Sequence, residues 1–413
     1  DGIRDYKVTG VQTCALPIYN NVEKIFILAG QSNMQGYGQV EPKSGKTAKG
    51  TLKYLTENGK YQYLRGNGSW KSFKNIWLVD FEYKDGNVKR NEGPLKANFK
   101  GAFFGPELGF GSKMESHLNT KLTLIKTAWG GRSIYQHFRP SSSPPPPDKS
   151  ILKGDKRVSV EYKLMIKLAR EIMAEYRKKN KKYELAGIVW HQGWNDRVQP
   201  IAVNEYLENC VNLINDLREE FGIDDLPFVL ANTGQGWRDG GAKPKNAPQK
   251  KLMDDQIQVP FDSRLKNKTN VAAVETRPFN TYSFQGQGEN EESIPMRQPS
   301  HWNQNGQVYM EIGIGLADAM NSIMSNSNKT LARCSGRNVR YEAEIQDCKN
   351  QCEVKTALVK GSVIGGYTGS GYVNLKKGDG SEVNWNDVRV SDSGSYKLKF
   401  KIPAESSDEP SSC

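Results

Sequence analysis

The sequence predicts an α/β fold in which a parallel sheet lies between two layers of helices, a three-layer α/β/α sandwich. Short apolar runs alternate with amphipathic helical patterns up to about residue 325, and strands separated by helices form parallel sheets that are covered on both faces. The composition then changes. Shorter alternating strands with glycine turns predict a partial β-sandwich module after the main domain.

Five apolar runs have the length and composition of buried strands. They contain consecutive β-branched or aliphatic residues, as strands buried on both faces do. Long helical patterns with one apolar stripe lie between them. The expected strands are residues 24–29, 122–128, 185–191, 227–232 and 271–275, and the clearest helices are residues 158–179, 202–221 and 305–323.

Two segments depart from this alternation. Residues 41–104 are rich in Gly, Asn, Lys and aromatic residues, and we expect a loop-rich excursion near the mouth of the site. Within it, Asp85-Gly86-Asn87 predicts a hairpin turn. Residues 141–147 read Ser-Ser-Ser-Pro-Pro-Pro-Pro, which predicts a stiff polyproline connector on the surface.

The chain divides into four parts. Residues 1–20 include Val8 to Ile18, which resembles the conceptual translation of a sequencing adapter. We exclude this part from the fold and expect the natural start, with any export signal, to be missing. Residues 21–325 form the main domain, residues 326–338 are polar and lack periodicity, as linkers do, and residues 339–413 form the smaller module.

Charge and hydropathy narrow the classes of partner. The formal net charge of +12 predicts a solvated basic surface, because the lysines are not clustered beside stacking aromatic residues on a nucleic-acid-binding module. No apolar run approaches the length of a membrane span. We therefore expect neither a nucleic-acid partner nor a membrane partner.

The six cysteines give little evidence of function. Cys210 lies on the apolar stripe of helix 202–221 and should be buried. Cys334, Cys348 and Cys352 cluster late in the chain, where a disulfide of an exported protein is one interpretation and free thiols are the other. Their pairing does not follow from the sequence. Zinc is less favoured because no histidine lies near them.

The most informative stretch runs from Lys24 to Met34, where a buried strand stops abruptly at Gly30-Gln31-Ser32-Asn33. Such an end places the Ser32 hydroxyl at the carboxyl edge of the sheet, where open α/β folds hold their ligands. The same serine would suit an ordinary helix N-cap. The tetrapeptide alone leaves both interpretations open.

Three further blocks follow this tetrapeptide in the chain. They are residues 126–133 (Lys-Thr-Ala-Trp-Gly-Gly-Arg-Ser), residues 190–196 (Trp-His-Gln-Gly-Trp-Asn-Asp) and residues 301–303 (His-Trp-Asn). With the first block they resemble the SGNH hydrolases, which have a flavodoxin-like sheet, and are closest to the acetylxylan esterase and sialate O-acetylesterase-like branch. The resemblance implies a serine esterase that needs no metal or organic cofactor.

The resemblance also assigns a nucleophile and a base. A serine hydroxyl is a weak nucleophile until a neighbouring base takes its proton. Ser32 would be the nucleophile and His301, in a loop before the last helix, would be the base. His117 and His137 would be structural, and His191, at a strand end, would have an architectural hydrogen-bonding role.

One position departs from the family's pattern. Many SGNH enzymes have an aspartate three residues before the catalytic histidine, whereas this chain has Gln298. An amide can orient an imidazole ring, but it cannot stabilise imidazolium by charge. Either the site is a dyad of Ser32 and His301, or another acid substitutes, for which Glu292 and Glu275 are the candidates.

Hydrogen-bond donors must point to the oxygen on which negative charge develops during ester cleavage. The resemblance assigns this oxyanion hole to the backbone N–H groups of Ser32 and Gly131 and to a side-chain amide of the third block. Gln192 fits the branch with His-Gln-Gly, and Asn195 fits the broader Gly-x-Asn-Asp pattern. We slightly favour Gln192.

The C-terminal segment resembles a truncated carbohydrate-binding module, in which Glu342 and Glu344 would help to hold a structural calcium or would be solvent-facing acids of an edge strand. We therefore expect a secreted esterase that removes O-acetyl groups from plant cell-wall polysaccharide, with an acetylated polysaccharide or oligosaccharide as its partner. The alternatives are a sialate O-acetylesterase and a non-catalytic carbohydrate-binding protein.

The excursion over residues 41–104 contains several aromatic residues. They would stack on sugars or, as we favour, form a small core of the excursion itself: Trp70, Phe73, Trp77, Phe103 and Phe104.

Overall fold

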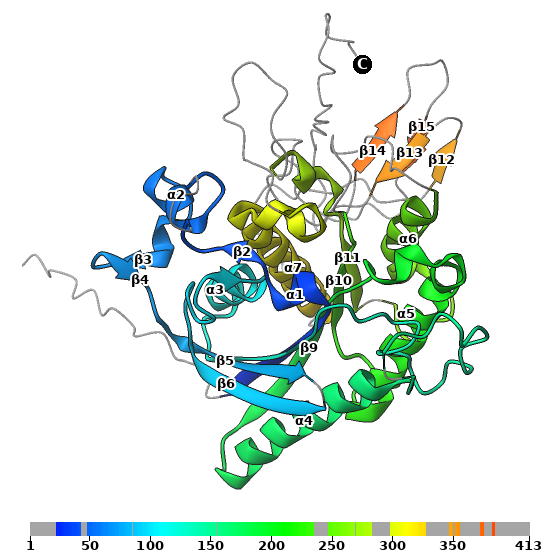
Figure 1. The fold of residues 1–413 in the computed structure, drawn as a ribbon, viewed down its shortest axis with the longest axis horizontal. Coiled ribbons are helices and arrows are strands. Elements are labelled where there is room, and N and C mark those ends of the chain that lie inside the picture. The colour runs from blue at the N-terminus through cyan, green and yellow to red at the C-terminus, as the bar shows by residue number, and fades with distance from the viewer. Residues whose placement is uncertain are drawn as a thin grey trace, which may run out of the picture.

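The computed structural model describes residues 22–42, 48–84, 86–154, 156–234, 247–268, 270–282 and 298–327, and four short strands between residues 347 and 384. A seven-stranded sheet of order β11-β10-β9-β1-β8-β5-β6 forms the centre (Figure 1). Neighbouring strands are parallel except for β5 and β6, which pair antiparallel. The predicted α/β fold is confirmed, and its sheet is mixed but mostly parallel.

All five predicted strands are present within a few residues of their expected bounds. The strands of the sheet are β1 (Glu23–Gly30), β5 (Phe73–Lys84), β6 (Asn87–Leu95), β8 (Leu122–Ala128), β9 (Tyr183–His191), β10 (Phe228–Ala231) and β11 (Val271–Val274). The helices are α1 (Ser32–Gln35), α2 (Leu52–Glu57), α3 (Glu107–Leu118), α4 (Val160–Lys178), α5 (Pro200–Phe221), α6 (Ala247–Gln258) and α7 (Gly306–Ser327). Two small antiparallel pairs join β2 (Gly38–Gln39) to β7 (Phe103–Phe104) and β3 (Arg65–Gly66) to β4 (Ser69–Trp70).

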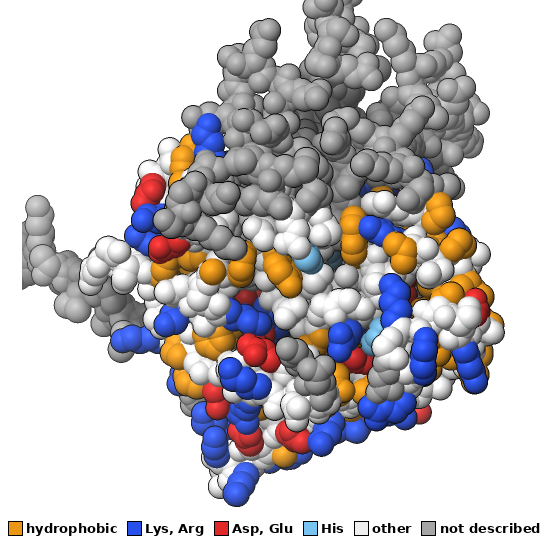
Figure 2. Space-filling view, viewed as in Figure 1, with side chains coloured by type: hydrophobic (Ala, Val, Ile, Leu, Met, Phe, Trp, Pro, Cys, Tyr) orange, Lys and Arg blue, Asp and Glu red, His pale blue; other side chains and the backbone are white. Residues whose placement is uncertain are grey.

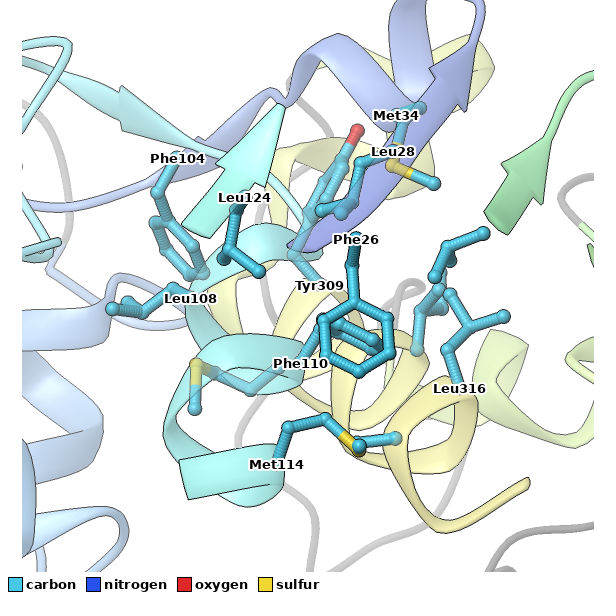
Figure 3. Close-up of a cluster of buried hydrophobic side chains, with 14 of the residues drawn as sticks. Phe26, Leu28, Met34, Phe104, Leu108, Phe110, Met114, Leu124, Tyr309 and Leu316 are labelled. Carbon is cyan, nitrogen blue, oxygen red and sulfur yellow. The ribbon is translucent and has the colours of Figure 1, made fainter. Parts of the chain in front are cut away.

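Strand β1 shows why helices cover both faces of the sheet. Successive side chains of a strand point to opposite faces. Ile25 and Ile27 are buried in a cluster with side chains of α4 and α5. Phe26 is buried on the other face with α3 and α7, where its ring meets that of Phe110 edge-on at 5.3 Å (Figure 3).

The prediction of a loop-rich excursion over residues 41–104 is wrong in part. Strands β5 and β6 extend the central sheet, and β5 lies parallel to β8. Apolar side chains of β5 are buried on both faces, but charged residues such as Asp80 interrupt them, which hid the strand in the sequence. The pairing of Lys84 with Asn87 confirms the hairpin. Trp70, Phe73 and Phe104 are buried, but they belong to the main hydrophobic cluster with Phe26, so the expected separate small core is wrong for these three.

Several predictions concern residues at the edge of the described chain or beyond it. Helix α7 continues to Ser327, so residue 326 is helical and does not begin the linker. Residues 1–20, most of the linker, Cys334, Glu342, Glu344 and Cys413 lie outside the described residues. The strands β12 (Asp347–Lys349) and β15 (Glu382–Asn384) pair antiparallel, as do β13 (Cys352–Lys355) and β14 (Tyr372–Leu375). Cys210 is a buried free cysteine, as predicted.

The surface of the described part is charged with both signs. On the face in Figure 2, Lys and Arg side chains are interspersed with Asp and Glu. Such mixing suits a solvated surface better than a nucleic-acid-binding patch. No described helix is both long enough and apolar enough to cross a bilayer.

Candidate active site

Ser32 lies at a sharp turn where β1 meets β9 closely. Gly30 ends β1 with a φ of +150°, and a Cβ atom at this position would lie 2.2 Å from the carbonyl oxygen of His191. Only glycine fits there. The chain then enters the four-residue helix α1 at Ser32, which is 6% exposed. The Ser32 hydroxyl therefore lies at the carboxyl edge of the sheet, as predicted.

The turn after β8 lies beside this serine. The backbone N–H of Trp129 donates to the carbonyl oxygen of Gly30 at 3.1 Å. A Cβ atom at Gly130 would lie 3.8 Å from the Cβ of Ser32. Gly131 is exposed and has a φ of +72°, a conformation that favours glycine. The tertiary structure thus brings the first and second sequence blocks together.

Gln31 connects the third block to the same turn. Its side-chain oxygen accepts hydrogen bonds from Gln192 Nε2 at 3.2 Å, from the Gly193 N–H at 3.2 Å and from the Asn195 N–H at 3.1 Å. Sequence reasoning assigned no role to Gln31. The sequence feature that could have indicated this role is an amide residue directly before Ser32, and the structure shows that its side chain is buried.

Gln192 is fully buried, and its amide nitrogen faces three acceptors. These are Gln31 Oε1, the Arg132 carbonyl at 2.9 Å and Asp196 Oδ2 at 2.6 Å. An amide has only two N–H bonds, so these contacts use all its donors. The side chain of Gln192 therefore braces the loops and has no N–H left for a substrate.

Asn195 has different surroundings. Its Nδ2 donates to the carbonyl oxygen of Gly131 at 2.8 Å, and its Oδ1 accepts from Lys153 Nζ at 3.2 Å. One N–H of the half-buried Asn195 amide has no hydrogen bond within the described part of the chain. Asn195 can thus offer a donor beside Gly131.

Asp196 holds the second and third blocks together. Its carboxylate accepts from the backbone N–H groups of Ile134 at 3.2 Å and Tyr135 at 3.0 Å, in addition to Gln192. Burial raises the pKa of Asp196 to about 6, although its hydrogen bonds act in the opposite direction. This carboxyl has a structural role, because it binds the third block to the backbone that follows the Gly130-Gly131 turn.

The loop that carries His301 is strained. Within the 3₁₀ segment Pro299–Gln304, the consecutive residues Trp302, Asn303 and Gln304 have φ values of +49°, +53° and +57°. Non-glycine residues in this region cost conformational energy and are often found at functional sites. The Asn303 side chain accepts from the Gln298 N–H at 3.1 Å, which helps to hold the loop.

Tyr309 of α7 joins the His301 loop to the serine turn. Its hydroxyl donates to Asn33 Oδ1 at 2.7 Å and lies 3.4 Å from the His301 carbonyl oxygen, and Asn33 Nδ2 donates to the Ser300 carbonyl at 3.4 Å. Figure 3 shows the Tyr309 hydroxyl beside Leu28 and Met34, at the end of β1. The fourth block thus lies beside Asn33, the residue after Ser32, although no hydrogen bond joins Ser32 Oγ to the imidazole among the described residues.

His301 is half-buried, and burial lowers its pKa below the usual value, so the ring is neutral at pH 7. Its Nδ1 is buried without a hydrogen-bond partner in the described part of the chain. Gln298 Oε1 instead accepts from Gln304 Nε2 at 3.0 Å. Glu275 Oε1 accepts from Asn232 at 2.8 Å, and its carboxylate also pairs with Arg277. Glu292 lies outside the described residues.

The other histidines have structural partners, as predicted. The Nδ1 of His191 lies 3.2 Å from the Ala231 carbonyl, and burial lowers the pKa of His191 to about 4. His117 bonds Asp318 at 2.7 Å, and His137 Nδ1 accepts from the Ser133 N–H at 3.1 Å.

Lys126 is a buried cation beneath the serine helix. Its ammonium donates to Glu107 Oε2 at 2.6 Å and to the Gln35 carbonyl at 2.8 Å, where α1 ends. The lysine is 0% exposed. Sequence reasoning missed this role, although a lysine within the otherwise uncharged strand 122–128 was the available signal. No group of three or more His, Cys, Asp and Glu side chains in the described ranges could hold a metal ion.

Residues 22–322 match the family described as carbohydrate esterase, sialic acid-specific acetylesterase. The chain belongs to this family. The resemblance drawn from the four blocks is confirmed, and the protein is a carboxylic ester hydrolase that removes O-acetyl groups from carbohydrates. A comparison with curated proteins finds no match.

Three of the solved structures that match this chain have low sequence identity to it. A protein from Arabidopsis thaliana is 18% identical, with 73% of this chain and 98% of that chain covered and a TM-score of 0.44. A carbohydrate acetylesterase from Xanthomonas citri is 14% identical, with 81% of this chain and 62% of that chain covered and a TM-score of 0.47. The structure of NanS is 12% identical, with 75% of this chain and 98% of that chain covered and a TM-score of 0.44. Likeness at this level says nothing about substrate.

Proposed function

We propose that this protein is a serine esterase that removes acetyl groups from plant cell-wall polysaccharide, such as acetylated xylan, through an acetyl-enzyme on Ser32. The observation that carries the proposal is the meeting of four distant blocks at one sheet edge. Gly130 lies against Ser32, Gln31 holds the third block, and Asn33 contacts the loop of His301.

In the proposed mechanism, Ser32 Oγ attacks the acetyl carbonyl while the neutral His301 imidazole takes the hydroxyl proton. The tetrahedral intermediate collapses, and imidazolium returns the proton to the departing sugar oxygen. Water then attacks the acetyl-enzyme with His301 as the base, which releases acetate and restores Ser32. Burial supports this role because it keeps His301 neutral at pH 7, and catalytic hydrogen bonds often form only when substrate is bound.

The proposed oxyanion hole consists of the backbone N–H groups of Ser32 and Gly131 and the side-chain amide of Asn195. Asn195 Nδ2 contacts the Gly131 carbonyl and keeps one N–H for the oxyanion. The N–H groups of Gln192 are already used by three protein acceptors. This geometry favours Asn195, whereas the sequence slightly favoured Gln192.

The preference for a plant polymer is supported by the resemblance of residues 339–413 to a carbohydrate-binding module, which would retain the enzyme on insoluble substrate. Such a polymer lies outside cells, so we also propose that the protein is secreted. The second candidate is a sialate O-acetylesterase, favoured by the sialic acid-specific description of the matching family.

The test is acetate release by the full chain from acetylated xylan and from O-acetylated sialic acid, with Ser32→Ala as the control. We expect faster release from xylan, and a loss of at least about a thousandfold on either substrate in Ser32→Ala. Faster release from sialic acid would establish the second candidate. Acetate release by Ser32→Ala at the wild-type rate would exclude an acetyl-enzyme on this serine.

A further inference from the structure

His301 has no described acid to stabilise its protonated form. Its Nδ1 is buried without a partner among the described residues, and Gln298, which stands where many SGNH enzymes have aspartate, bonds Gln304 instead. During acylation of a serine, however, the base becomes imidazolium, and this charge needs stabilisation.

The ring of Tyr37 covers one face of this imidazole. The two ring centroids are 3.9 Å apart, and the ring planes differ by only 7°. The face of an aromatic ring carries negative potential and attracts a cation placed above it. The ring of Phe103 also lies near, with its centroid 5.8 Å from that of Tyr37.

Two glycines flank Tyr37 where the backbone packs closely against its neighbours. At Gly36, with a φ of +100°, a Cβ atom would lie 2.3 Å from the Gly105 nitrogen. At Gly38, a Cβ atom would lie 3.0 Å from the Phe104 ring and from the Tyr309 Cβ. The backbone on both sides of Tyr37 is thus closely packed, which fixes the point from which its side chain reaches His301.

No described group around His301 supplies a competing charge. Among the described residues, the titratable neighbours named by its contacts are Tyr37 before β2 and Tyr309 on α7. Burial raises the pKa of Tyr309. Glu107 on α3, which acts on Tyr309, pairs with Lys126. Burial is the cause of the lowered pKa of His301, with no contribution from a described carboxylate.

We propose that the face of Tyr37 replaces the missing acid as the positioning residue for His301: it fixes the plane of the imidazole and stabilises the imidazolium formed during catalysis. The inference rests on the proposed function, in which His301 is the base. A ring contact is weaker than a carboxylate, so it implies a modest rate contribution, roughly threefold to thirtyfold.

The experiment compares Tyr37→Leu, which removes the aromatic face, with Tyr37→Phe, which keeps it. We expect Tyr37→Phe to match the wild type and Tyr37→Leu to lower kcat by roughly threefold to thirtyfold with little change in KM. The second readout is the imidazole pKa of His301, measured by NMR in a Ser32→Ala background. In Tyr37→Leu this pKa should fall by roughly half a unit to one and a half units. The acid limb of the plot of kcat against pH should shift to lower pH by the same amount.

Equal kcat and equal His301 pKa in the Leu and Phe variants would overturn the inference. So would a loss of about a thousandfold or more in Glu292→Gln, because that acid would then perform the role. Tyr37→Met serves as the second variant if Tyr37→Leu does not fold. The NMR readout needs no turnover, so an active Ser32→Ala enzyme would end the proposed function while the effect of Tyr37 on the imidazole stayed measurable.

Discussion

Gln192 and Asn195 carry the same functional group at neighbouring positions, but their surroundings give them different uses. Gln192 is 0% exposed, and three protein acceptors surround its two N–H groups, whereas the Asn195 amide lies beside Gly131 with one N–H that has no partner among the described residues. Residue type alone does not separate them. What separates them is the number of N–H groups that the fold has already used.

We expect Asn195→Ala to lower kcat by about a hundredfold to a thousandfold, because it removes one donor to the developing oxyanion. Gln192→Ala should instead lower the free energy of unfolding, by about 1–3 kcal/mol, because buried acceptors lose their donor. Steady-state kinetics on an aryl acetate and urea denaturation separate the two effects. A larger kcat loss in Gln192→Ala at unchanged stability would restore Gln192 as the donor.

His191 makes the stability depend on pH. Its pKa is about 4 in the folded protein and about 6.5 when unfolded, since burial penalises the charged ring. Between these values the unfolded chain binds more protons, so the free energy of unfolding falls as the pH drops from 6.5 to 4, by about 3 kcal/mol in total.

This contribution should disappear in His191→Asn, which keeps a donor for the Ala231 carbonyl but does not titrate. We expect the variant to lose less stability than the wild type between pH 7 and pH 4.5 in urea denaturation. The pKa of Asp196 is raised to about 6, so its protonation increases the free energy of unfolding as the pH falls, opposite to the effect of His191. This contribution is the same in both proteins and cancels in the comparison. Parallel stability curves would refute the role of His191.

At the scale of elements, α1 is too short to be stable by itself, because a four-residue helix closes hardly one turn. Tertiary contacts hold it at both ends. The Gln35 carbonyl accepts from Lys126 at its C-terminal end, and Asn33 bonds Tyr309. The position of Ser32 therefore depends on β8 and α7 as much as on β1.

Lys126→Met should destabilise the protein by about 3–5 kcal/mol, because it leaves the buried Glu107 carboxylate without its cation. Lys126→Met combined with Glu107→Gln should recover much of this stability, since the neutral amide needs no counter-ion. We expect kcat to stay low in the double variant because the end of α1 remains unanchored. Thermal denaturation and aryl-acetate kinetics measure both effects, and a double variant with full kcat would show that Lys126 acts only on stability.

At the scale of the whole molecule, the fold of the esterase lies within residues 22–327. The seven strands of the central sheet and α1 to α7 all fall in this range, as does the family match over residues 22–322. We therefore expect the proposed binding role of residues 339–413 to be separable from catalysis.

A variant that ends at residue 327 should unfold cooperatively and keep the wild-type kcat on a soluble aryl acetate. Its retention on insoluble xylan should fall, because the proposed binding module is gone. Calorimetry, kinetics and a sedimentation assay with xylan provide the measurements. Full retention on xylan by the shortened protein would place polysaccharide binding in the esterase domain.

The sequence predicted elements best where burial is uniform. Residues 122–128 form β8 with the predicted bounds, because every side chain of that strand is buried. Helix α6 was missed, since its Gln, Lys and Asp residues show only a weak apolar stripe. Strands β5 and β6 were missed because charged residues interrupt their apolar pattern.

The sequence by itself determined the α/β class, the turn at Gly30 and the identity of the four blocks, because strand burial and glycine geometry are local properties of a few adjacent residues. Only the tertiary structure decided which amide keeps a free N–H, that Lys126 holds α1, and that Tyr37 stacks on His301. These contacts join residues far apart in the chain. Their geometry depends on how the sheet edge and α7 pack, which local patterns do not encode.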